Sequence, residues 1–437
     1  MRYSSTRGQA PQVTFSQALV QGLAPDGGLY VPGNWPQPGS AFQSGGTATP
    51  DAFLPALAAQ VISGFAEGDA LAASLGDIVH DAFNFPAPLK PLGNSGQLRV
   101  LELFHGPTAA FKDFGARFLA ACLTRVERSG ARPLRILVAT SGDTGGAVAA
   151  AFHKRPGIEV VVLFPKGRVT PTQQQQLTCW GDNVTSLAVR GTFDDCQRMV
   201  KEAFLDPGMH QHAELSSANS INIGRLLPQA VYYAASSLQV QKEQGSEASY
   251  IIPSGNLGNS VACLWAKQMG FPIDRIVLAH NANVMVPEFL ATGKLRPRPG
   301  IPTLASAMDV GNPSNLERML WMFPDAASLG AQLTAYSVSD EAIKSRIVAD
   351  HKTYGETWCP HTATAAEVYV KDLSEAQRCA HNWVLVATAH PAKFREIVEP
   401  LVGPVPVPQN LLRLFELPSR FDEIDPTLAA LRSATDG

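Results

Sequence analysis

Short runs of β-branched and other apolar residues alternate with loops and helix-like segments from about residue 134 onward. Each run is followed by a polar or glycine-rich loop and then by a segment with helical spacing. This alternation is typical of βα units, in which helices cover parallel strands. We therefore predict an α/β fold with two helix-covered, mainly parallel sheets. The predicted strands are 135–140, 159–164, 184–189, 249–253, 275–280 and 383–388.

Residues 1–95 show a different pattern. A turn at Asp26-Gly27-Gly28 precedes a stretch rich in proline, glycine and serine at 31–50, and helical spacing follows over 51–86. Linker composition returns at 91–97. We predict three parts: a mostly helical N-terminal region over 1–95, a large α/β domain from 96–133 and 240–437, and a small α/β domain over 134–239.

Lys112 lies at the mouth of another predicted helix, which starts near Asp113. Apolar residues recur there at three- and four-residue offsets and form one buried face. Two interpretations of Lys112 stay open. Its stem can lie on the core while its amine reaches water, or desolvation can lower the pKa of the amine so that it forms a Schiff base. The apolar face consists of Phe111, Phe114, Phe118, Leu119 and Cys122.

The composition indicates a large buried core and a small partner. The chain has 437 residues, of which 45% are hydrophobic and only 17% are charged, and its formal net charge is −3. No long run of one charge sign occurs, which argues against a nucleic-acid arm or a membrane-surface helix. No stretch approaches the roughly 18 apolar residues that a membrane span needs. We expect a small-molecule partner, no nucleic acid and no membrane.

The cysteines and histidines do not indicate a metal site. The six cysteines at 122, 179, 196, 263, 359 and 379 form no C-x-x-C pair, which favours reduced thiols in a hydrophobic core. His210 and His212 lack ligands at metal-binding spacing, and we expect them at the surface. The start of the chain has no apolar signal segment, and we expect a cytoplasmic protein. Four glutamines at 173–176 are predicted to cover a helix surface.

Loops after parallel strands are where open sheets bind ligands. The loop 140–146 offers Ser141, Gly142 and Thr144 ahead of a predicted helix, a combination suited to a carboxylate or another anion. The alternative is an ordinary strand-to-helix turn in which Asp143 or Thr144 caps the helix.

A second loop, 253–259, carries Gly255 and Gly258 ahead of a helix, so that backbone N–H groups can converge on a phosphate. It matches neither a G-x-x-x-x-G-K-[ST] loop nor a G-x-G-x-x-G motif, which argues against a nucleoside triphosphate or NAD. The alternative is a simple glycine-rich turn.

Thr388 ends the predicted strand 383–388, where its hydroxyl can face the same crevice. The alternative is that it caps the following helix. A ligand that has a phosphate, an aldehyde for a lysine and a ring nitrogen would use Lys112, both loops and Thr388 together. Pyridoxal 5'-phosphate is such a ligand.

The motifs that carry these residues resemble those of threonine synthases, which are fold type II pyridoxal-phosphate enzymes. The resemblance is to the longer form with an N-terminal region, and it runs in order from about residue 14 to about 400. The last 35 or so residues carry nothing diagnostic. The matching segments are 14–32, 104–118, 139–148, 217–229, 253–259, 306–315 and 388–394.

The resemblance implies two helix-covered, mainly parallel sheets with the active site between them. It also implies a lyase that converts O-phospho-L-homoserine and water to L-threonine and phosphate, the last step of threonine biosynthesis. Lys112 then corresponds to the Schiff-base lysine, and Thr388 to the partner of the pyridine nitrogen. Asp143 stands where many fold type II enzymes have asparagine beside the ring hydroxyl, while Ser141, Gly142 and Thr144 receive the substrate carboxylate. The cofactor-phosphate loop comprises Ser254, Gly255, Asn256, Leu257, Gly258 and Asn259.

A substrate phosphate requires a second anion site besides that of the cofactor. The segment 216–225 and Lys166 provide candidates, each with helix capping or a solvated face as the alternative. For Arg225 we favour function, and for Lys166 the two interpretations are balanced. His105 is either a local turn residue or a neighbour of the substrate. The candidates are Ser217, Asn219, Ser220, Asn222, Arg225 and Lys166.

Two rival functions stay open. A threonine or serine dehydratase shares the fold and the cofactor but needs no second phosphate site. A non-catalytic vitamin B6 carrier, or a relic that binds without turnover, belongs to another class, and the intact Lys112 and loops argue against it. Release of phosphate from O-phosphohomoserine, compared with release of ammonia from threonine, separates the two enzymes. The sequence allows a monomer or a homodimer.

Overall fold

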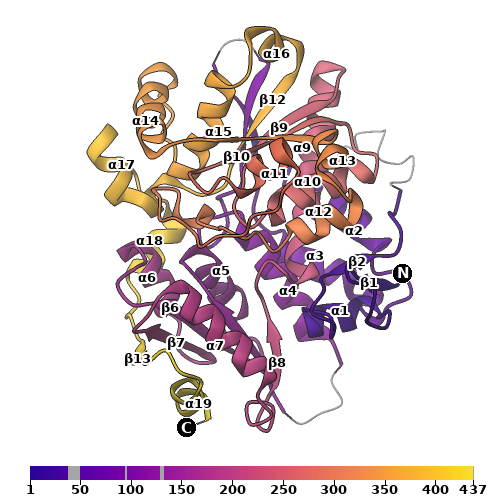
Figure 1. Cartoon of the computed structure of the whole chain (residues 1–437), viewed down its shortest axis with the longest axis vertical. Coiled ribbons are helices and arrows are strands. Elements are labelled where there is room, and N and C mark those ends of the chain that lie inside the picture. Colours follow the sequence, from indigo (N-terminus) through magenta and orange to yellow (C-terminus); the bar gives the residue numbers. More distant parts are fainter. Residues whose placement is uncertain (38–49, 94–95, 128–131, 437) are drawn as a thin grey trace.

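The computed structural model shows two helix-covered sheets, one above the other in Figure 1, with the N-terminal region at their side. The predicted α/β fold with two mainly parallel sheets is thereby confirmed. Most of the Pro/Gly/Ser-rich stretch at 31–50 and part of the linker at 91–97 lie outside the described residues. The structure describes residues 1–37, 50–93, 96–127 and 132–436.

Five parallel strands form the sheet in the lower half of Figure 1, in the order β13-β7-β6-β5-β8. The runs predicted at 135–140, 159–164 and 184–189 form its three central strands. They are almost continuously apolar because helices cover both faces of the sheet. The strands are β5 (Leu134–Ala139), β6 (Ile158–Pro165), β7 (Val184–Val189), β8 (Glu214–Ser217) and β13 (Asp422–Ile424).

The helices of this half bury one face each, except the helix 143–152, in which nearly every residue is buried. In α7 (Phe193–Leu205) the buried residues Cys196, Met199, Val200 and Ala203 recur at the spacing of a helix. Thr192 caps α7, since its side chain accepts a hydrogen bond from the third backbone N–H of the helix. The other helices are α5 (Asp143–Phe152), α6 (Pro171–Thr178) and α19 (Leu428–Asp436).

Six strands form the upper sheet, in the order β11-β10-β9-β12-β4-β3. All neighbours are parallel except β3, which pairs antiparallel with β4 at one edge. The predicted strands at 249–253, 275–280 and 383–388 are confirmed as β9, β10 and β12. The strands are β3 (Leu89–Pro91), β4 (Leu98–Glu102), β9 (Ala248–Pro253), β10 (Ile273–His280), β11 (Leu333–Ser337) and β12 (Asn382–Ala387).

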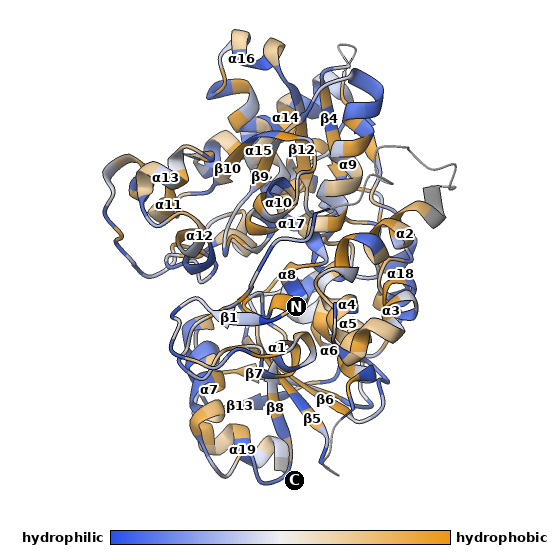
Figure 2. Cartoon of the chain, turned by 90° about the vertical axis from the view of Figure 1, so that its right-hand side faces the viewer, coloured by the Kyte–Doolittle hydropathy of each residue, from blue (hydrophilic) through white to orange (hydrophobic). Residues whose placement is uncertain are grey.

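Helices cover this sheet as well, and Figure 2 shows hydrophobic residues gathered between the layers in both halves. Trp265 and Trp383 are among the largest fully buried side chains. The helices are α9 (Gln229–Gln244), α10 (Gly258–Gln268), α11 (Met285–Thr292), η3 (Ser306–Met308), α12 (Leu316–Met322), α13 (Ala326–Gly330), α14 (Asp340–Tyr354), α15 (Pro360–Lys371), α16 (Glu375–Ala380), η4 (Pro391–Phe394), α17 (Arg395–Val402) and α18 (Gln409–Phe415).

The helix predicted after Lys112 is α4 (Lys112–Arg125), which packs against α5 and α8 (Ile223–Leu226) between the two halves. A Cβ at Gly115 of α4 would lie 2.3 Å from the carbonyl oxygen of Arg225, so only glycine allows this close approach. The predicted apolar face is confirmed. Its members Phe114, Phe118, Leu119 and Cys122 are fully buried, and Phe111 is partly buried.

The segment predicted to be helical, 51–86, is helical over most of its length, with breaks at 64–69 and no helix over 83–86. The structure adds a two-stranded antiparallel sheet to this region. Asp26 shapes the predicted turn, because its carboxylate accepts hydrogen bonds from Gly28 N and the Ser5 hydroxyl. The elements are β1 (Tyr3–Ser5), α1 (Phe15–Gln21), β2 (Tyr30–Pro32), α2 (Pro50–Ser63), η2 (Ala70–Ser74) and α3 (Leu75–Ala82).

The sheet topology bears on the predicted domain boundaries, which stay a prediction. We assigned all of 240–437 to the larger domain, but β13 pairs with β7 of the five-stranded sheet. The end of the chain therefore returns to the half that holds residues 134–217.

Five of the six cysteines are buried as predicted, whereas Cys379 is exposed and that assignment is wrong. His210 and His212 lie at the surface as predicted. Among the described helices, none combines the length and the apolar composition that crossing a membrane requires.

Candidate active site

The carboxyl ends of β4, β9 and β12 lie next to one another in the six-stranded sheet, and in the other sheet β5 lies between β6 and the edge strand β8. Lys393, which follows β12, forms an ion pair with Asp143, which follows β5, with 3.0 Å between Nζ and Oδ1. This pair joins the two sheets at the edges where parallel sheets bind ligands. It marks the centre of the candidate active site.

Lys112 is the first residue of α4, and the charges of Asp143 and Lys393 at this centre act on its amine. Burial lowers the pKa of Lys112 to about 8, against the opposing charge of Asp143 and with help from the charges of Lys393 and Arg225. Among the described residues, none forms a hydrogen bond or an ion pair with its amine, and its Nζ lies 6.0 Å from the centre of the Phe111 ring. An amine in this state is suited to attack a carbonyl carbon. This favours the interpretation of Lys112 as a Schiff-base lysine over that of a lysine whose amine only reaches water.

The loop after β5 is shaped by Thr140 and Gly142. The Thr140 hydroxyl oxygen accepts hydrogen bonds from the backbone N–H groups of Gly142 and Gly145, both at 2.9 Å. Gly142 has a φ of 138°, and a Cβ there would lie 2.5 Å from the Gln173 side chain. Only glycine adopts this conformation in this space.

Ser141 and Thr144 keep part of their surface accessible, as a loop that receives a substrate carboxylate requires. The alternative in which Asp143 or Thr144 caps the helix is wrong, because α5 begins without a side-chain cap hydrogen bond. The Asp143 side chain instead forms the ion pair with Lys393.

Asp143 and Lys393 are both buried, with side-chain exposures of 4% and 0%. Lys393 also donates a hydrogen bond to the carbonyl oxygen of Thr108 at 2.7 Å, and Gln173 donates to Asp143 Oδ1 at 3.2 Å. Burial alone would raise the pKa of Asp143, but the positive charges of Lys393, Lys112 and His361 hold it well below its usual range. Asp143 is therefore a buried carboxylate held by Lys393.

The loop after β9 presents a row of backbone donors. Within the described part of the chain, no group accepts a hydrogen bond from the N–H groups of residues 255–258. Leu257 has a φ of 64°, in the left-handed region, and leads directly into α10. A Cβ at Gly255 would lie 2.7 Å from Met308 Cα. The glycine and the strained turn thus form a cradle of N–H groups for an anion at a helix N-terminus.

The Ser254 and Asn256 side chains of this loop already have protein partners. Ser254 exchanges a hydrogen bond with Ser260 at 2.8 Å. Asn256 donates to the Ser220 hydroxyl and accepts from Ser314 N, both at 2.6 Å. These two side chains fix the shape of the loop and leave its backbone free for the ligand.

Asn259 lies in the first turn of α10 and is buried. Its Oδ1 accepts hydrogen bonds from Tyr232 and Tyr233, while its Nδ2 has no partner among the described residues. A buried amide donor without a partner is unusual in a folded protein. Asn259 therefore has a donor to offer to a ligand.

Thr388 directly follows β12 and is largely buried. Its carbonyl oxygen accepts a hydrogen bond from Phe111 N at 2.9 Å, which fixes Thr388 beside the residue before Lys112. Its hydroxyl makes no hydrogen bond with any described residue. The cap of η4 is His390, whose side chain accepts from Ala392 N. The alternative in which Thr388 is the helix cap is therefore wrong.

In the polar segment 216–225, some side chains are held by protein partners and others have a polar atom without a described partner. Asn222 is fully buried and caps α8, because its Oδ1 accepts a hydrogen bond from Gly224 N at 2.9 Å. Ser217 accepts a hydrogen bond from Asn219 N at 3.3 Å, and the Ser220 hydroxyl accepts one from the Asn256 amide at 2.6 Å. The Oδ1 atom of Asn219 is buried without a described partner. Asn222 thus matches the capping alternative.

Arg225 is a buried guanidinium without a carboxylate in ion-pair contact among the described residues. Its Nη1 donates to the carbonyl oxygen of Ala218, and its buried Nε has no partner. Burial lowers the pKa of Arg225 to about 10, although the charge of Asp113 opposes the shift. A buried cation with a free donor is suited to bind an anion.

Lys166 does not join this group. Its side chain is half-exposed and forms an ion pair at 2.7 Å with Glu423 of β13. His105 likewise pairs with Glu102, three residues earlier, at 2.7 Å, which favours the local turn residue over the substrate neighbour.

Four residues of the site were not predicted from the sequence. Besides Lys393, they include two of the four glutamines of α6, so that their assignment to a helix surface is wrong. Gln173 and Gln176 are buried, and Gln176 donates to the Thr108 carbonyl oxygen at 3.1 Å. The signal was their i,i+3 spacing, which places both on one face of the helix.

His361 near the start of α15 was also missed. Its Nε2 accepts a hydrogen bond from Ala307 N at 3.1 Å, so Nδ1 carries the proton, and Nδ1 has no described partner. Burial lowers the pKa of His361 to about 4, against the charge of Asp143. His361 is therefore a neutral buried donor in the electrostatic neighbourhood of Lys112 and Asp143.

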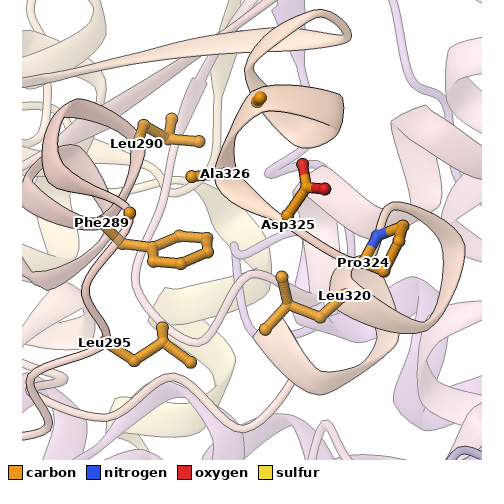
Figure 3. A pocket seen from close by; sticks show the side chains of 9 residues that line it. Phe289, Leu290, Leu295, Leu320, Pro324, Asp325 and Ala326 are labelled. Carbon is orange, nitrogen blue, oxygen red and sulfur yellow. The ribbon is translucent and has the colours of Figure 1, made fainter.

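A surface pocket of about 610 Å³ lies between α11 and the segment from α12 to α13 (Figure 3). Its lining is mostly apolar, and its one carboxylate, Asp325, caps α13. None of the predicted site residues lines it. The pocket is therefore separate from the chemistry described above.

The residues of the site fit pyridoxal phosphate. They provide an amine without a partner, a cradle of unpaired N–H groups for the phosphate, and a free hydroxyl on Thr388 for a ring nitrogen. Orphaned donors on Asn259, Arg225 and His361 leave room for further anionic oxygens. Roles for individual residues stay proposals.

Comparisons with known proteins agree with this chemistry. The family described as pyridoxal-phosphate dependent enzyme matches residues 84–389, the threonine synthase N terminus matches 2–83, and the threonine synthase C-terminal family matches 362–434. The similarity thus extends past residue 400, where the sequence motifs ended. The last 35 or so residues, in which no diagnostic motif was found, are matched by the C-terminal family as far as residue 434.

Three relatives cover nearly the whole chain. The threonine synthase of Haemophilus influenzae is 39% identical over 427 residues, which are 97% of this chain and 96% of the relative. The crystal structure of threonine synthase from Escherichia coli has a TM-score of 0.88 and 36% identity, and covers 99% of both chains. The structure of PLP-bound threonine synthase from Brucella melitensis has a TM-score of 0.90 and 34% identity, with 99% and 98% covered. The chain is a member of the threonine synthase family, and thus a pyridoxal-phosphate-dependent enzyme of fold type II.

Proposed function

We propose that the protein converts O-phospho-L-homoserine and water to L-threonine and phosphate. The observation that carries the proposal is the coexistence of two anion sites around one amine. The unpaired N–H groups of residues 255–258 suit the cofactor phosphate. The Arg225 guanidinium, whose Nε has no partner among the described residues, suits a second phosphate near Lys112. A dehydratase would need only the first of these sites.

In this proposal Lys112 holds the cofactor and later moves a proton. When bound, pyridoxal phosphate supplies an electron sink for the carbons next to the amino group. The Lys112 amine, with a pKa near 8, is a base able to take the α proton of the substrate. The β carbon loses a proton, the bond between the γ carbon and the phosphate oxygen breaks, and phosphate departs. The γ carbon gains a proton, the hydroxyl of water adds at the β carbon, and the α carbon regains its proton.

The substrate is held at its two charged ends. Ser141, Gly142 and Thr144, at the start of α5, receive the carboxylate. Arg225 binds the departing phosphate through its Nε–H, which has no partner among the described residues. Both contacts would be made in a site that Lys393, Gln173 and Gln176 close from the side of α6 and η4, which strengthens them by excluding water.

Asn259 and His361 add donors whose partners are not found among the described residues. We propose that the Asn259 amide completes the phosphate cradle and that the neutral imidazole of His361 donates to an anionic oxygen of a bound ligand. Thr388 serves the ring nitrogen without adding a charge.

The test is an assay of the purified protein with O-phosphohomoserine that follows threonine and phosphate together. Equal amounts of the two products support the proposal. Ammonia from threonine, without phosphate release from O-phosphohomoserine, would indicate a dehydratase. Cofactor binding without either product would indicate a carrier or a relic.

We also propose that the enzyme acts in the cytoplasm as a monomer or a homodimer. All six cysteines are free thiols in the structure, which is typical of proteins from a reducing compartment. Cell fractionation and light scattering of the purified enzyme test these two statements.

A further inference from the structure

We propose that Lys393 is a positioning residue for the reaction. It pairs with Asp143 and thereby keeps this carboxylate from binding the amine of Lys112, which stays free to capture the cofactor. The inference rests on the role of Lys112 given under the proposed function. It goes beyond that function because it assigns a task to a second buried lysine and to Asp143.

Contacts distinguish the two lysines clearly. The amine of Lys393 has two acceptors, Asp143 Oδ1 at 3.0 Å and the Thr108 carbonyl oxygen at 2.7 Å, and its side chain is fully buried. The amine of Lys112 has no acceptor among the described residues. Yet each lysine acts electrostatically on the same carboxylate. Asp143 thus interacts electrostatically with both lysines and is in ion-pair contact with only one of them, Lys393.

The charges around Lys112 show what Lys393 does. Asp143 on α5 favours the ammonium form of Lys112, whereas Lys393 on η4 and Arg225 on α8 oppose it. His361 on α15 is neutral near pH 7 because burial lowers its pKa to about 4. Without Lys393, the carboxylate would keep Lys112 as its remaining close cation. The lysine amine would then be protonated over a wider pH range and would attack an aldehyde more slowly.

The surroundings hold Lys393 in place. Thr108, whose carbonyl oxygen it binds, is fixed by Asp113 through its N–H at 2.9 Å and its hydroxyl at 2.7 Å. The same carbonyl oxygen accepts a hydrogen bond from Gln176 of α6. Lys393 therefore connects η4, the segment before α4 and α5. A purely structural strut would have the same contacts, so the test must measure the state of Lys112 itself.

The experiment follows the rate at which the full-length protein, freed of cofactor, recaptures pyridoxal phosphate between pH 6 and 10. In the wild-type protein this rate should rise with pH to a midpoint near the Lys112 pKa of about 8. In Lys393→Met the midpoint should move up, with capture at pH 7 slower by about tenfold for each unit of the move. In Asp143→Asn the midpoint should move down. The double variant should lie between the two.

Two controls separate positioning from stability. Lys393→Arg keeps the positive charge and should keep the midpoint close to that of the wild type. Lys267→Met removes a partly buried lysine of α10 that donates to the Asp274 carbonyl oxygen, and should leave the midpoint unchanged. Melting curves of all variants report how much of the fold is lost in each.

Opposite shifts in Lys393→Met and Asp143→Asn would establish the inference, because loss of stability alone cannot change the sign of a shift. An unchanged midpoint in a folded Lys393→Met variant would overturn it. If Lys393→Met does not fold, a midpoint that stays at its wild-type pH in Asp143→Asn overturns it instead. Failure of the proposed function has a different signature, since capture of the cofactor would proceed normally while no threonine forms from O-phosphohomoserine.

Discussion

Single side chains with unsatisfied groups carry most of the chemistry proposed for this enzyme. Lys112, Arg225, Thr388 and His361 lie at the meeting point of two sheets and each retains a donor or acceptor without a described protein partner. Buried polar groups are normally paired, since an unpaired one costs about 1–3 kcal/mol. Several such groups around one amine therefore indicate where a ligand binds.

Reduction with borohydride tests which lysine carries the cofactor. After reduction of the enzyme loaded with pyridoxal phosphate, peptide mapping should find the label on Lys112, because its amine is free and its pKa is about 8. Label on Lys393, the other lysine of the site, would contradict this assignment and the role given to its ion pair.

Thr388 is expected to influence the cofactor and not the stability of the fold. Thr388→Val should weaken cofactor affinity by about 0.5 to 1.5 kcal/mol, the net contribution of one neutral hydrogen bond. Thr388→Asp should retain the cofactor and alter its absorbance, because a carboxylate favours a protonated ring nitrogen. Spectra and melting curves of the cofactor-free variants check both statements. Since His390 caps η4, a large loss of thermal stability in Thr388→Val would count against the role.

Arg225 is expected to serve the substrate phosphate. Arg225→Ala should reduce kcat/KM for O-phosphohomoserine more than about tenfold, since loss of a charge-assisted hydrogen bond costs about 1.5–3 kcal/mol. Arg296→Ala, which removes an exposed arginine, provides the control. Unchanged turnover at low substrate in the Arg225 variant would remove this residue from the site.

At the scale of whole elements, α6 shows how a polar helix can face a site. Gln173 and Gln176 point inward, whereas Gln174 and Gln175 between them are only half-buried. Gln173 begins the helix by a capping box with Thr170 and also donates to Asp143. Gln173 therefore makes two contacts, one with Thr170 at the start of α6 and one with the Asp143 carboxylate.

We expect Gln173→Leu to lower the free energy of unfolding by about 1–3 kcal/mol, because a buried carboxylate and a helix N-terminus each lose a partner. Gln174→Leu, one residue along the same helix, should have an effect within about 0.5 kcal/mol. Urea unfolding of both variants measures the difference. Equal losses in the two would show that the contact with Asp143 contributes nothing.

Elements with strong local patterns were predictable from the sequence. The buried face of α4, the Thr192 cap of α7 and the strand 184–189 follow from spacing and from capping residues alone. Lys112 was found because an amine beside an apolar helix face is unusual. The two glycine-rich loops were found because glycine and small polar residues follow buried strands.

Contacts between distant segments were not predictable in this way. Lys393 lies in a motif that was recognised, but its partner Asp143 comes from the other sheet, and only the docking of the two halves brings them together. The inward glutamines of α6 look like a solvated face, because a polar side chain that meets a buried carboxylate has the same sequence pattern as one that meets water. Lys166 was a candidate for the substrate phosphate but forms an ion pair with Glu423 instead. This partner lies on β13, near the end of the chain, and could not be predicted from the sequence around Lys166.

The whole molecule contains several buried or partly buried histidines that are neutral in the folded state. Burial lowers the pKa of His280 to about 3 and that of His361 and of His390 to about 4, from an ordinary value of 6.5. As the pH falls below 6.5, the unfolded chain takes up protons that the folded chain does not. The free energy of unfolding therefore decreases with falling pH, until the folded-state values are reached.

His280→Leu should make this decrease less steep. Each such histidine contributes up to about 1.4 kcal/mol per pH unit between its two pKa values. His280 is suited to the test because its Nε2 has no described hydrogen-bond partner and it lies outside the Lys112 cluster. Urea unfolding of wild-type and variant protein from pH 7 to 4 gives the two slopes. The same slope in both would refute the assignment, and His212→Leu at the surface is the control.

The position of β13 affects how the protein is made. Its partner β7 ends at Val189, whereas β13 begins at Asp422, after every strand of the other sheet has been synthesised. On the ribosome, one edge of the five-stranded sheet therefore stays without its last strand until the ribosome has almost finished. An open edge can pair with another chain. We expect this edge to need protection by chaperones for longer than the rest of the sheet during synthesis. Truncation before residue 422 would remove β13 and leave the edge permanently open.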